Sequence, residues 1–340
     1  MGLRVAINGF GRIGRSVFRA WWQRQQLSQQ NSLEIVAVND LYPAGAAAHL
    51  LKFDSNHGRL AAPISATDNQ LVIDQHDVLW LQQADPSQLP WQELGIDLVL
   101  ECSGRFTSAE QSMAHLRAGA NKVLVSAPAE GADRTVVFGV NHAELQPDEA
   151  IISNGSCTTN CLALVAQLMQ KSVGINQGMV TTIHCYTNDQ PLQDQFHPDL
   201  RRARAAGQAI VPTATGAAEA LGSVIPELAG KLTGFSVRVP TQSVSLLDFT
   251  FTSSQRTSVR AVNQVFLDAA AGSSAGLVEC CQEPLVSSDF VSQSASAIID
   301  LSLTEVNGDM VKVCAWYDNE WGFANRMVDL AVHLAELQTS

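Results

Sequence analysis

Three glycines follow the first apolar run of the chain, at positions 9, 11 and 14. They form a G-x-G-x-x-G pattern between an expected strand at 3–8 and an expected helix at 14–26. Glycines at these spacings allow a tight turn, a close approach of the backbone to a pyrophosphate, and close packing of the helix on the strand. The chain therefore opens on a predicted dinucleotide-binding unit, with Gly9, Gly11 and Gly14 as candidate cofactor-binding residues.

The second expected strand, at 33–40, ends in Asp40. An acidic side chain at this place can accept hydrogen bonds from the ribose hydroxyls, and it would repel the additional phosphate of NADP. Asp40 therefore favours NAD as the cofactor. The alternative is that Asp40 is only a turn residue in the run VNDLYPAG.

Short β-branched runs continue to the end of the first half, at 97–104, 121–128, 135–141 and 150–154. Because helical stretches separate the earlier runs, residues 1–156 are expected to form a Rossmann domain with a parallel sheet. The runs then lengthen and alternate, at 178–187, 235–251, 294–303 and 309–318, which predicts a mixed or antiparallel sheet in a second, α+β domain at 157–319. The chain is thus expected to be α/β, with a final amphipathic helix at 320–340 that packs back on the first domain.

Charge and cysteine content limit the possible partners. A formal charge of −12 argues against general binding to nucleic acid or to anionic lipid, and no apolar run approaches the length of a membrane span. Seven cysteines, an odd number, and the lack of a recognisable export signal favour a reducing cytoplasm. One basic cluster, Arg201, Arg202 and Arg204, is either a local phosphate site or a solvated helix face.

Cys157 lies in the run SNGSCTTNC, just before a helical stretch. Unpaired backbone N–H groups and the dipole at a helix N-terminus stabilise a thiolate, so Cys157 is the candidate nucleophile. Cys161, four residues later beside Leu164 and Val165, suits a buried and inert thiol. A metal site at the two cysteines would need further Cys or His at close spacing, and the sequence has none there, so no metal is expected.

His184 ends the apolar run VTTI and is followed by a polar segment. It is a candidate general base, although a single histidine is often structural and the spacing alone does not pair it with Cys157. The segment between His184 and Ile210 is long, polar and without a clear period, as functional or interface loops are.

Nine motifs together make the sequence resemble the glyceraldehyde-3-phosphate dehydrogenase family over essentially its whole length: INGFGRIGR, HLLKFDSNHGRL, SNGSCTTNC, HCYTNDQ, DLRRARAA, PTATGAA, VIPEL with GKLTG, RVPT and WYDNEWG. The resemblance implies a cytoplasmic homotetramer in which the 188–207 loop lines a neighbouring cofactor site. It also implies a glycolytic oxidation in which glyceraldehyde 3-phosphate, NAD and inorganic phosphate give 1,3-bisphosphoglycerate and NADH through a cysteine thioester.

The resemblance carries roles to individual positions. It makes Cys157 the nucleophile and His184 its base. The cofactor would be held by Gly9, Arg12, Ile13 and Asp40, with Ser126 and Asn319 near the nicotinamide end. The substrate phosphate would be held by Thr187, Asp189 and Arg238, and the attacking phosphate by Ser156, Thr158, Thr215, Gly216 and Arg204. Arg201 and Arg202 are left to loop packing and subunit contacts.

Several positions depart from the common family pattern. Residues 195–198, QFHP, and the ending NEWGFANRM are closer to the related erythrose-4-phosphate dehydrogenases, which form 4-phosphoerythronate, whereas TATG at 213–216 and SAP at 126–128 favour the phosphorylating enzymes. Ala84 replaces an arginine that lies against the adenine in many members, so NADP is not excluded. A third alternative is a binding protein without catalysis on the same fold.

Overall fold

The computed structural model describes residues 2–27 and 32–339. The expected first domain also includes residues 1 and 28–31, and the expected last helix includes residue 340; these positions lie outside the described residues. The described chain divides into two compact units. Unit 1 comprises 2–138, 142–155 and 324–339, and unit 2 comprises 139–141 and 156–323.

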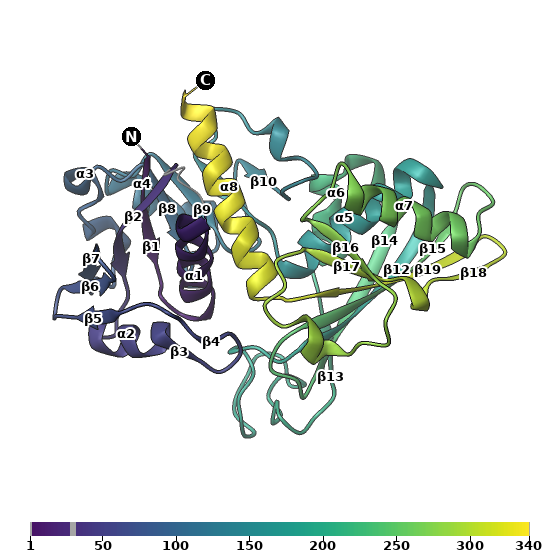
Figure 1. The fold of residues 1–340 in the computed structure, drawn as a ribbon, viewed down its shortest axis with the longest axis horizontal. Helices are drawn as coiled ribbons and strands as arrows, with labels where there is room; N and C mark the ends of the chain where they lie inside the picture. The colour runs from purple at the N-terminus through teal and green to yellow at the C-terminus, as the bar shows by residue number, and fades with distance from the viewer. Residues whose placement is uncertain (1, 28–31, 340) are drawn as a thin grey trace. The chain divides into compact units, whose positions relative to one another are not determined.

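Unit 1 is built on one nine-stranded sheet (Figure 1). The strand order is β10-β11-β9-β8-β1-β2-β7-β6-β5, parallel from β10 to β7, with β6 and β5 antiparallel at the edge. Its strands are β1 (Leu3–Asn8), β2 (Leu33–Asn39), β5 (Ile64–Ala66), β6 (Gln70–Ile73), β7 (His76–Leu81), β8 (Leu98–Glu101), β9 (Lys122–Val125), β10 (Arg134–Thr135) and β11 (Ile151–Ser153). Because β8 and β9 are buried throughout, their sequences are continuous apolar runs rather than alternating ones.

Helices connect these strands. They are α1 (Arg12–Leu27), α2 (Ala44–Lys52), α3 (Trp91–Leu94) and α4 (Ala109–Arg117), with a small hairpin of β3 (Phe53–Asp54) and β4 (Gly58–Arg59) after α2. Helix α1 joins β1 to β2, and the register of those strands pairs Asn8 with Asn39 and, on the other side, with Glu101 of β8. The carboxyl ends of three parallel strands therefore meet at one edge, where open α/β sheets bind their ligands.

The last helix, α8 (Trp321–Thr339), lies beside α1 in unit 1 from residue 324 onward. Arg24 of α1 donates to Asp329, at 2.5 Å, and to the side-chain oxygen of Asn325, at 2.8 Å. His333 contacts the carbonyl oxygen of His142 through Nε2, at 3.0 Å. These side-chain contacts fix the helix on unit 1.

Three expected strands differ from the structure. In 135–141 only Thr135 belongs to a strand. Val136 still donates its N–H to the carbonyl oxygen of Ser153 in β11, and the chain then turns at Gly139, which has a φ of +86°. The run 235–251 is two strands, β14 (Leu232–Val239) and β15 (Ser245–Ser253). The run 294–303 gives β17 (Ala297–Asp300) and then one 3-10 turn, 301–303.

Unit 2 contains an eight-stranded mixed sheet. The order is β13-β14-β12-β15-β19-β17-β16, with β18 paired to β19; β12 and β14 are parallel, as are β16 and β17, and the other pairs are antiparallel. The remaining strands are β12 (Ile175–Cys185), β13 (Val211–Ala214), β16 (Val278–Cys281), β18 (Glu305–Asn307) and β19 (Met310–Tyr317). The sequence prediction of a parallel first sheet and a mixed second sheet is confirmed.

Helices of unit 2 pack on its sheet, with α5 between the other two (Figure 1). They are α5 (Cys157–Ser172), α6 (Ala217–Val224) and α7 (Val259–Ala271). Helix α5 is buried over most of its length, as expected for a helix inside a core. Its N-terminus is thereby held against β12 and β19, the strands that carry His184 and Tyr317.

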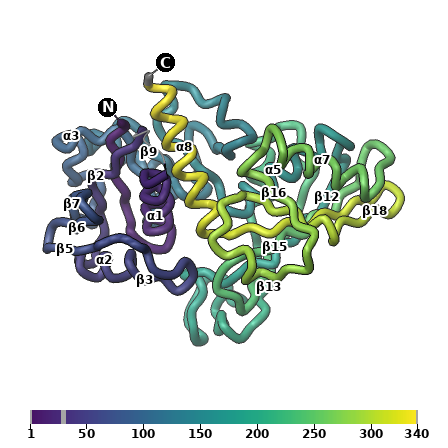
Figure 2. The backbone as a smooth tube through the Cα atoms, viewed as in Figure 1, coloured from purple at the N-terminus to yellow at the C-terminus, as the bar shows by residue number. Residues whose placement is uncertain are grey.

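Residues 186–210, all of them described, form no helix or strand (Figure 2). This segment leaves the end of β12 and returns to the sheet as β13. Among residues 2–27 and 32–339, none of the helices is both long enough and apolar enough to cross a membrane.

Candidate active site

A cavity of about 230 Å³ opens at the carboxyl ends of the unit 1 strands. Its lining residues are Asn8, Gly9, Gly11, Asn39, Asp40, Leu41, Tyr42, Gln83, Ala84, Cys102, Ser103, Arg105 and Phe106. Gly9, Gly11 and Asp40, three of the expected cofactor residues, line it together. Ala84 also lines it, so the position of the missing adenine-side arginine is part of the same cavity.

Two of the three glycines in the loop have no room for a side chain. Gly9 has a φ of +91°, and a Cβ built on it would lie 2.4 Å from the Cα of Ser103. A Cβ on Gly14 would lie 2.1 Å from the carbonyl oxygen of Gly9. A Cβ on Gly11 would meet nothing within 4 Å. Gly9 and Gly14 are therefore required by the packing of the loop, whereas Gly11 leaves open space on the cavity side for a ligand to approach the backbone.

The Asp40 carboxylate holds this loop in place. It accepts the backbone N–H of Phe10 at 2.6 Å and that of Tyr42 at 3.1 Å. The side chain of Arg12 turns to Asp54, with which it forms a two-point ion pair. Burial raises the pKa of the Asp54 carboxyl, but the hydrogen bond and charge of Arg12, together with the backbone N–H groups of Asn56 and His57, outweigh burial and hold that pKa well below its usual range. Arg12 and Ile13 thus offer a cofactor the N–H groups of the first turn of α1.

A buried polar network forms the floor of the cavity. Glu101, which is 1% exposed, accepts hydrogen bonds from Asn8 and from both the N–H and the hydroxyl of Ser103. His115 donates to Glu101 through Nε2, because its Nδ1 accepts from the indole of Trp91. These bonds fix the ends of β1 and β8 behind the glycine loop. The loop, the open approach at Gly11 and the Asp40 carboxylate together fit a dinucleotide.

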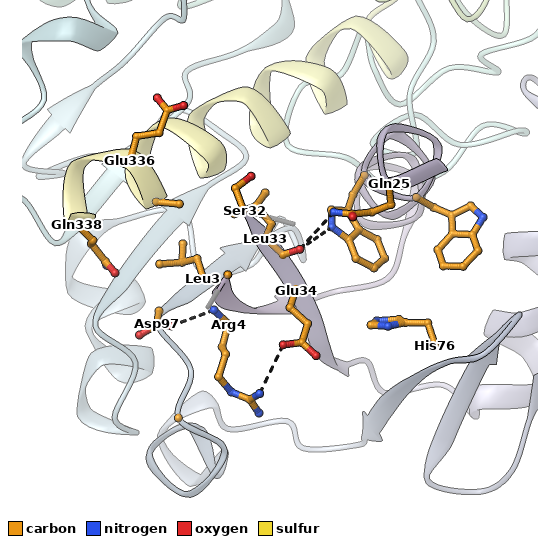
Figure 3. Close-up of a pocket in the computed structure, with 15 residues that line it drawn as sticks. Leu3, Arg4, Gln25, Ser32, Leu33, Glu34, His76, Asp97, Glu336 and Gln338 are labelled. Carbon is orange, nitrogen blue, oxygen red and sulfur yellow. Dashed lines mark hydrogen bonds and ion pairs between the residues drawn. The ribbon is translucent and has the colours of Figure 1, made fainter. Parts of the chain in front are cut away.

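A larger cavity of about 900 Å³ lies at the opposite, amino end of the unit 1 strands (Figure 3). Leu3 and Leu33, the first residues of β1 and β2, line it, and Arg4 pairs there with Glu34 at 3.8 Å. Ser32 at its rim adjoins the undescribed residues 28–31. Since open α/β sheets bind ligands at the carboxyl ends of their strands, the smaller cavity is the candidate cofactor site.

Cys157 is the first residue of α5 in unit 2. Ser156 precedes it as the N-cap and accepts the backbone N–H of Thr159 at 3.0 Å. Gly155, with a φ of +63°, turns the chain into the helix. The run Gly-Ser-Cys therefore places the thiol at a capped helix N-terminus, as the sequence predicts.

His184 comes from β12 and lies against this thiol. Its Nε2 is 3.5 Å from the sulfur of Cys157, and the side chain is 4% exposed. Its Nδ1 is 2.7 Å from the carbonyl oxygen of Cys185. In the tautomer that carries the proton on Nδ1, this nitrogen donates to that carbonyl and the lone pair of Nε2 faces the sulfur. Arg238 of β14 also reaches this point, with Nη1 2.7 Å from Nδ1 and 3.1 Å from the same carbonyl.

Burial dominates the protonation of this pair. Burial and then the charge of Arg238 lower the pKa of His184 to about 3, so the imidazole is neutral at pH 7 and can accept a proton. Burial also raises the pKa of the Cys157 thiol, and Arg238 and Thr158 offset only part of that increase. The sequence argument from the helix N-terminus alone favoured the thiolate; in the structure, desolvation outweighs that effect. The geometry therefore suits proton transfer from Cys157 to His184 during attack.

Arg202 joins the predicted substrate residues, although the sequence argument left it out. Its Nη1 donates to Asp189 at 2.7 Å, and its Nε donates to the hydroxyl of Thr213 at 2.9 Å. Its charge also contributes to the lowered pKa of His184. His197 holds the other oxygen of Asp189 at 3.2 Å. The three arginines stand within four positions, and the segment has no period, so the sequence alone could not indicate which one faces the site.

Arg204 is not brought to this group. Its guanidinium is 66% exposed and pairs with Asp194 at 2.8 Å. Thr215 and Gly216 lie at the start of α6, where the hydroxyl of Thr215 accepts the N–H of Ala217 at 3.3 Å. Thr187 follows β12 and is partly exposed.

The two residues expected near the nicotinamide lie in different units. Ser126 follows β9 in unit 1 and donates its N–H to the carbonyl of Glu101. Asn319 lies in unit 2, where its side-chain oxygen accepts the N–H of Val244 and the thiol of Cys185, both at 3.1 Å. Among the described residues, no group of three or more His, Cys, Asp or Glu side chains could hold a metal ion.

Comparison with known families finds two matches along the chain. Residues 3–109 match the model described as "Glyceraldehyde 3-phosphate dehydrogenase, NAD binding domain". Residues 156–319 match the model described as "Glyceraldehyde 3-phosphate dehydrogenase, C-terminal domain". Together the matches cover most of the chain, and they fall on units 1 and 2 in turn.

Curated relatives match over nearly the full length. A glyceraldehyde-3-phosphate dehydrogenase of Pseudomonas aeruginosa is 50% identical over 335 residues, which are 98% of this chain and 99% of the relative. The chromosomal enzyme of that name from Cupriavidus necator is 49% identical over 336 residues, with the same coverage. That of Geobacillus stearothermophilus is 48% identical over 337 residues, again covering 98% and 99%.

Proposed function

Because the chain belongs to the glyceraldehyde-3-phosphate dehydrogenase family, we propose that it oxidises glyceraldehyde 3-phosphate with NAD and inorganic phosphate to 1,3-bisphosphoglycerate and NADH. The observation that carries this proposal is the 3.5 Å approach of His184 Nε2 to the Cys157 sulfur at the N-terminus of α5. A nucleophile and a neutral base in contact are what acyl transfer through a thioester requires.

The first step joins the substrate to the enzyme. The sulfur of Cys157 attacks the aldehyde carbon, its proton passes to Nε2 of His184, and His184 returns that proton to the oxygen of the new hemithioacetal. His184 then removes the hydroxyl proton while the carbon loses hydride, which leaves an acyl thioester on Cys157. The low pKa of His184, about 3, keeps the imidazole unprotonated at neutral pH, so Nε2 can act as an acceptor.

NAD is the cofactor of the family domain that residues 3–109 match. Gly9, Gly11, the N–H groups of Arg12 and Ile13, and the Asp40 carboxylate would hold the dinucleotide at the carboxyl ends of the strands. Bound NAD supplies the hydride acceptor. Ser126 lies in unit 1 and Asn319 in unit 2. Their role near the nicotinamide end of the cofactor, which the family resemblance implies, is part of the proposal.

The second step releases the product. An oxygen of inorganic phosphate attacks the thioester carbon, and the carbon–sulfur bond breaks to give the acyl phosphate and the free sulfur of Cys157. Two phosphoryl groups must therefore bind near the thioester, and arginine, hydroxyl and N–H groups suit them. Arg238, Thr187 and Asp189 are proposed for the substrate phosphate, and Ser156, Thr158, Thr215 and Gly216 for the attacking one. We assign Arg202 to the second set, because its Nε donates to Thr213, two positions before Thr215, whereas Arg204 pairs with Asp194.

We propose that residues 1–156 form the cofactor-binding domain and residues 157–319 the catalytic domain. The helix at 320–340 is proposed to pack back on the first domain. The two compact units support these limits, because unit 1 gives way to unit 2 between residues 155 and 156 and resumes at residue 324.

The chain is also proposed to form a homotetramer in which 188–207 lines a neighbouring cofactor site. Large apolar side chains stand exposed in or beside that segment, at Leu192, Phe196, Leu200 and Ile210, and Phe196 is fully exposed. A monomeric protein normally does not leave such a group in water. Sedimentation equilibrium tests the proposal: a tetramer that Phe196→Asp weakens is expected, and a monomeric wild-type protein would contradict it.

Cytoplasmic localisation is proposed because all seven cysteines are free. A nucleophilic Cys157 needs a reducing compartment to stay a thiol.

The activity is tested by NADH absorbance with purified protein. Glyceraldehyde 3-phosphate and erythrose 4-phosphate are each supplied with NAD or NADP, with and without inorganic phosphate. Rapid, phosphate-dependent reduction of NAD with the triose is expected. Preference for the tetrose without phosphate dependence would instead indicate the erythrose-4-phosphate reaction.

Cysteine labelling tests the nucleophile separately. Limited alkylation with iodoacetamide at pH 7, read by peptide mass spectrometry, should modify Cys157 much faster than the other six cysteines. His184→Asn should slow that reaction and lower turnover by about 10²–10⁴-fold, the usual contribution of a general base. Equal labelling of all seven cysteines would refute the catalytic role and favour a binding protein on the same fold.

A further inference from the structure

The hydroxyl of Tyr317 lies between two threonine hydroxyls at the end of β19. It is 2.7 Å from Oγ1 of Thr182 on β12 and 2.9 Å from Oγ1 of Thr158 on α5. All three side chains are at most 4% exposed. Burial raises the pKa of Tyr317 well above its usual range, so the phenol keeps its proton and acts as a neutral donor.

The direction of these hydrogen bonds follows from counting protons. Each hydroxyl carries one proton and can donate it once. Within the described part of the chain, the Thr182 hydroxyl has no partner other than Tyr317. If Thr158 donated to Tyr317, Tyr317 would donate to Thr182, and the buried Thr182 proton would have no acceptor, which is costly. In the opposite direction, Thr182 donates to Tyr317 and Tyr317 donates to Thr158, so the protons of Thr182 and Tyr317 are both accepted.

That direction leaves the Thr158 proton available at the end of the chain. Thr158 directly follows Cys157 in the first turn of α5, and hydrogen bonding from its side chain lowers the pKa of the Cys157 thiol. We propose that Tyr317 is a positioning residue that, held by Thr182, aims the hydroxyl proton of Thr158 at the Cys157 sulfur. The contact connects β12, β19 and the first turn of α5 through side chains alone.

This inference rests on the proposed function, because it gives the hydroxyl chain a task in that reaction. The sulfur carries negative charge twice, when it loses its proton to His184 and when it leaves the thioester. A donor already turned toward the sulfur stabilises both states, since hydrogen bonds to an ionised acceptor are stronger than those to a neutral one. Without Tyr317, the Thr158 hydroxyl is free to rotate away.

The test removes one hydroxyl and keeps the ring. Tyr317→Phe retains the edge-on contact with the His184 ring, whose centroid is 6.0 Å away, but it cannot donate to Thr158. Alkylation of Cys157 by iodoacetamide, followed against pH, should slow about three- to tenfold below the thiol pKa, the loss expected for one hydrogen bond, and the profile should move to higher pH. Thr182→Val should act in the same direction, and Thr182→Ser should restore the wild-type profile.

Ser236→Ala is the matched control. Ser236 stands opposite Thr182 on the neighbouring strand β14, and its buried hydroxyl has no hydrogen-bond partner. Its removal should leave the profile unchanged, and thermal melting should show that every variant is folded. If Tyr317→Phe does not fold, Thr182→Val carries the test.

The outcomes separate this inference from the function beneath it. Fast labelling of Cys157 with the same pH profile in wild type, Tyr317→Phe and Thr182→Val would overturn the inference alone. Equal labelling of all cysteines in the wild type would overturn the proposed function.

Discussion

The Nε2 atom of His184 lies 3.5 Å from the sulfur of Cys157, although the two residues are 27 positions apart. The contact exists because α5 packs across β12, so that the first residue of the helix meets the end of the strand. Arg238 reaches the same imidazole from β14, whose residue 238 is in register with His184. The site is thus a product of sheet register as much as of the local sequence.

Burial of His184 should make the protein sensitive to acid. Its pKa is about 3 in the folded chain and near 6.5 in the unfolded chain, so the unfolded state binds more protons between these values. The free energy of unfolding is therefore unaffected by this histidine above about pH 6.5, and it decreases as the pH falls from 6.5 toward 3. At pH 5 the free energy of unfolding should be lower by about 2 kcal/mol, because pH 5 lies 1.5 units below 6.5 and each unit is worth about 1.36 kcal/mol. Urea unfolding at pH 7.5 and pH 5 measures it.

His184→Asn removes the titrating group and should lose correspondingly less stability between these pH values. His49→Asn, which changes an exposed histidine, should behave like the wild type. An equal acid response in His184→Asn and wild type would show that His184 is not the responsible group.

Two substitutions in the glycine loop should separate effects on thermal stability from effects on cofactor binding. Gly14→Ala places a methyl group 2.1 Å from the carbonyl oxygen of Gly9 and should lower the melting temperature by several degrees, because the loop must move. Gly11→Ala meets no protein atom within 4 Å, so it should keep the wild-type melting temperature. It should nevertheless weaken NAD binding about tenfold or more, because the added methyl occupies the approach to the pyrophosphate. Calorimetry with and without NAD provides both readings, and unchanged NAD affinity in Gly11→Ala would contradict the assignment of the cavity.

Arg202 and Arg204 form a natural pair for testing the phosphate site. Arg202→Gln should raise the KM for inorganic phosphate by about 10- to 100-fold, because it removes a charged donor that lies beside Thr213. Arg204→Gln should change it less than twofold, because that side chain is mostly exposed and pairs with Asp194. Initial rates at varied phosphate, with triose and NAD saturating, give the comparison. A larger effect of Arg204→Gln than of Arg202→Gln would instead support the sequence-based assignment of Arg204 to the attacking phosphate.

Local signals in the sequence located much of the fold. The strands at 3–8 and 33–39 and the helix after Gly11 were predicted to within about two residues, because apolar runs and glycine punctuation are local. The strand predicted at 135–141 is much shorter in the structure because the chain turns at Gly139, in a left-handed conformation, although Val136 and Val137 are buried. An apolar pattern in the sequence indicates that residues are buried, but buried residues do not always belong to a strand.

The candidate site was predictable only in part for the same reason. The setting of Cys157 is encoded beside it by Gly155 and Ser156, so the helix N-terminus could be predicted. Its contact with His184 depends on a strand that is distant in sequence, and only the family resemblance, now confirmed, paired the two residues in advance. The contact of Arg238 with His184 was not predicted. Tyr317 gave no signal at all, since its role depends on two hydroxyls from other elements.

Asp40 should govern the choice between NAD and NADP. Its carboxylate supports the glycine loop through Phe10 and also lines the cofactor cavity, where its charge opposes an additional phosphate. Asp40→Asn keeps an oxygen that can accept the Phe10 N–H but removes the charge. NAD should then bind about 5- to 30-fold more weakly, through loss of a charged acceptor worth about 1–2 kcal/mol, while NADP binding should improve. Isothermal titration with each cofactor measures the ratio, with Asp68→Asn, an exposed aspartate of the same unit, as the control. If Asp40→Asn leaves the NAD to NADP ratio unchanged, Asp40 only stabilises the loop, and selection against the additional phosphate must come from other residues of the cavity.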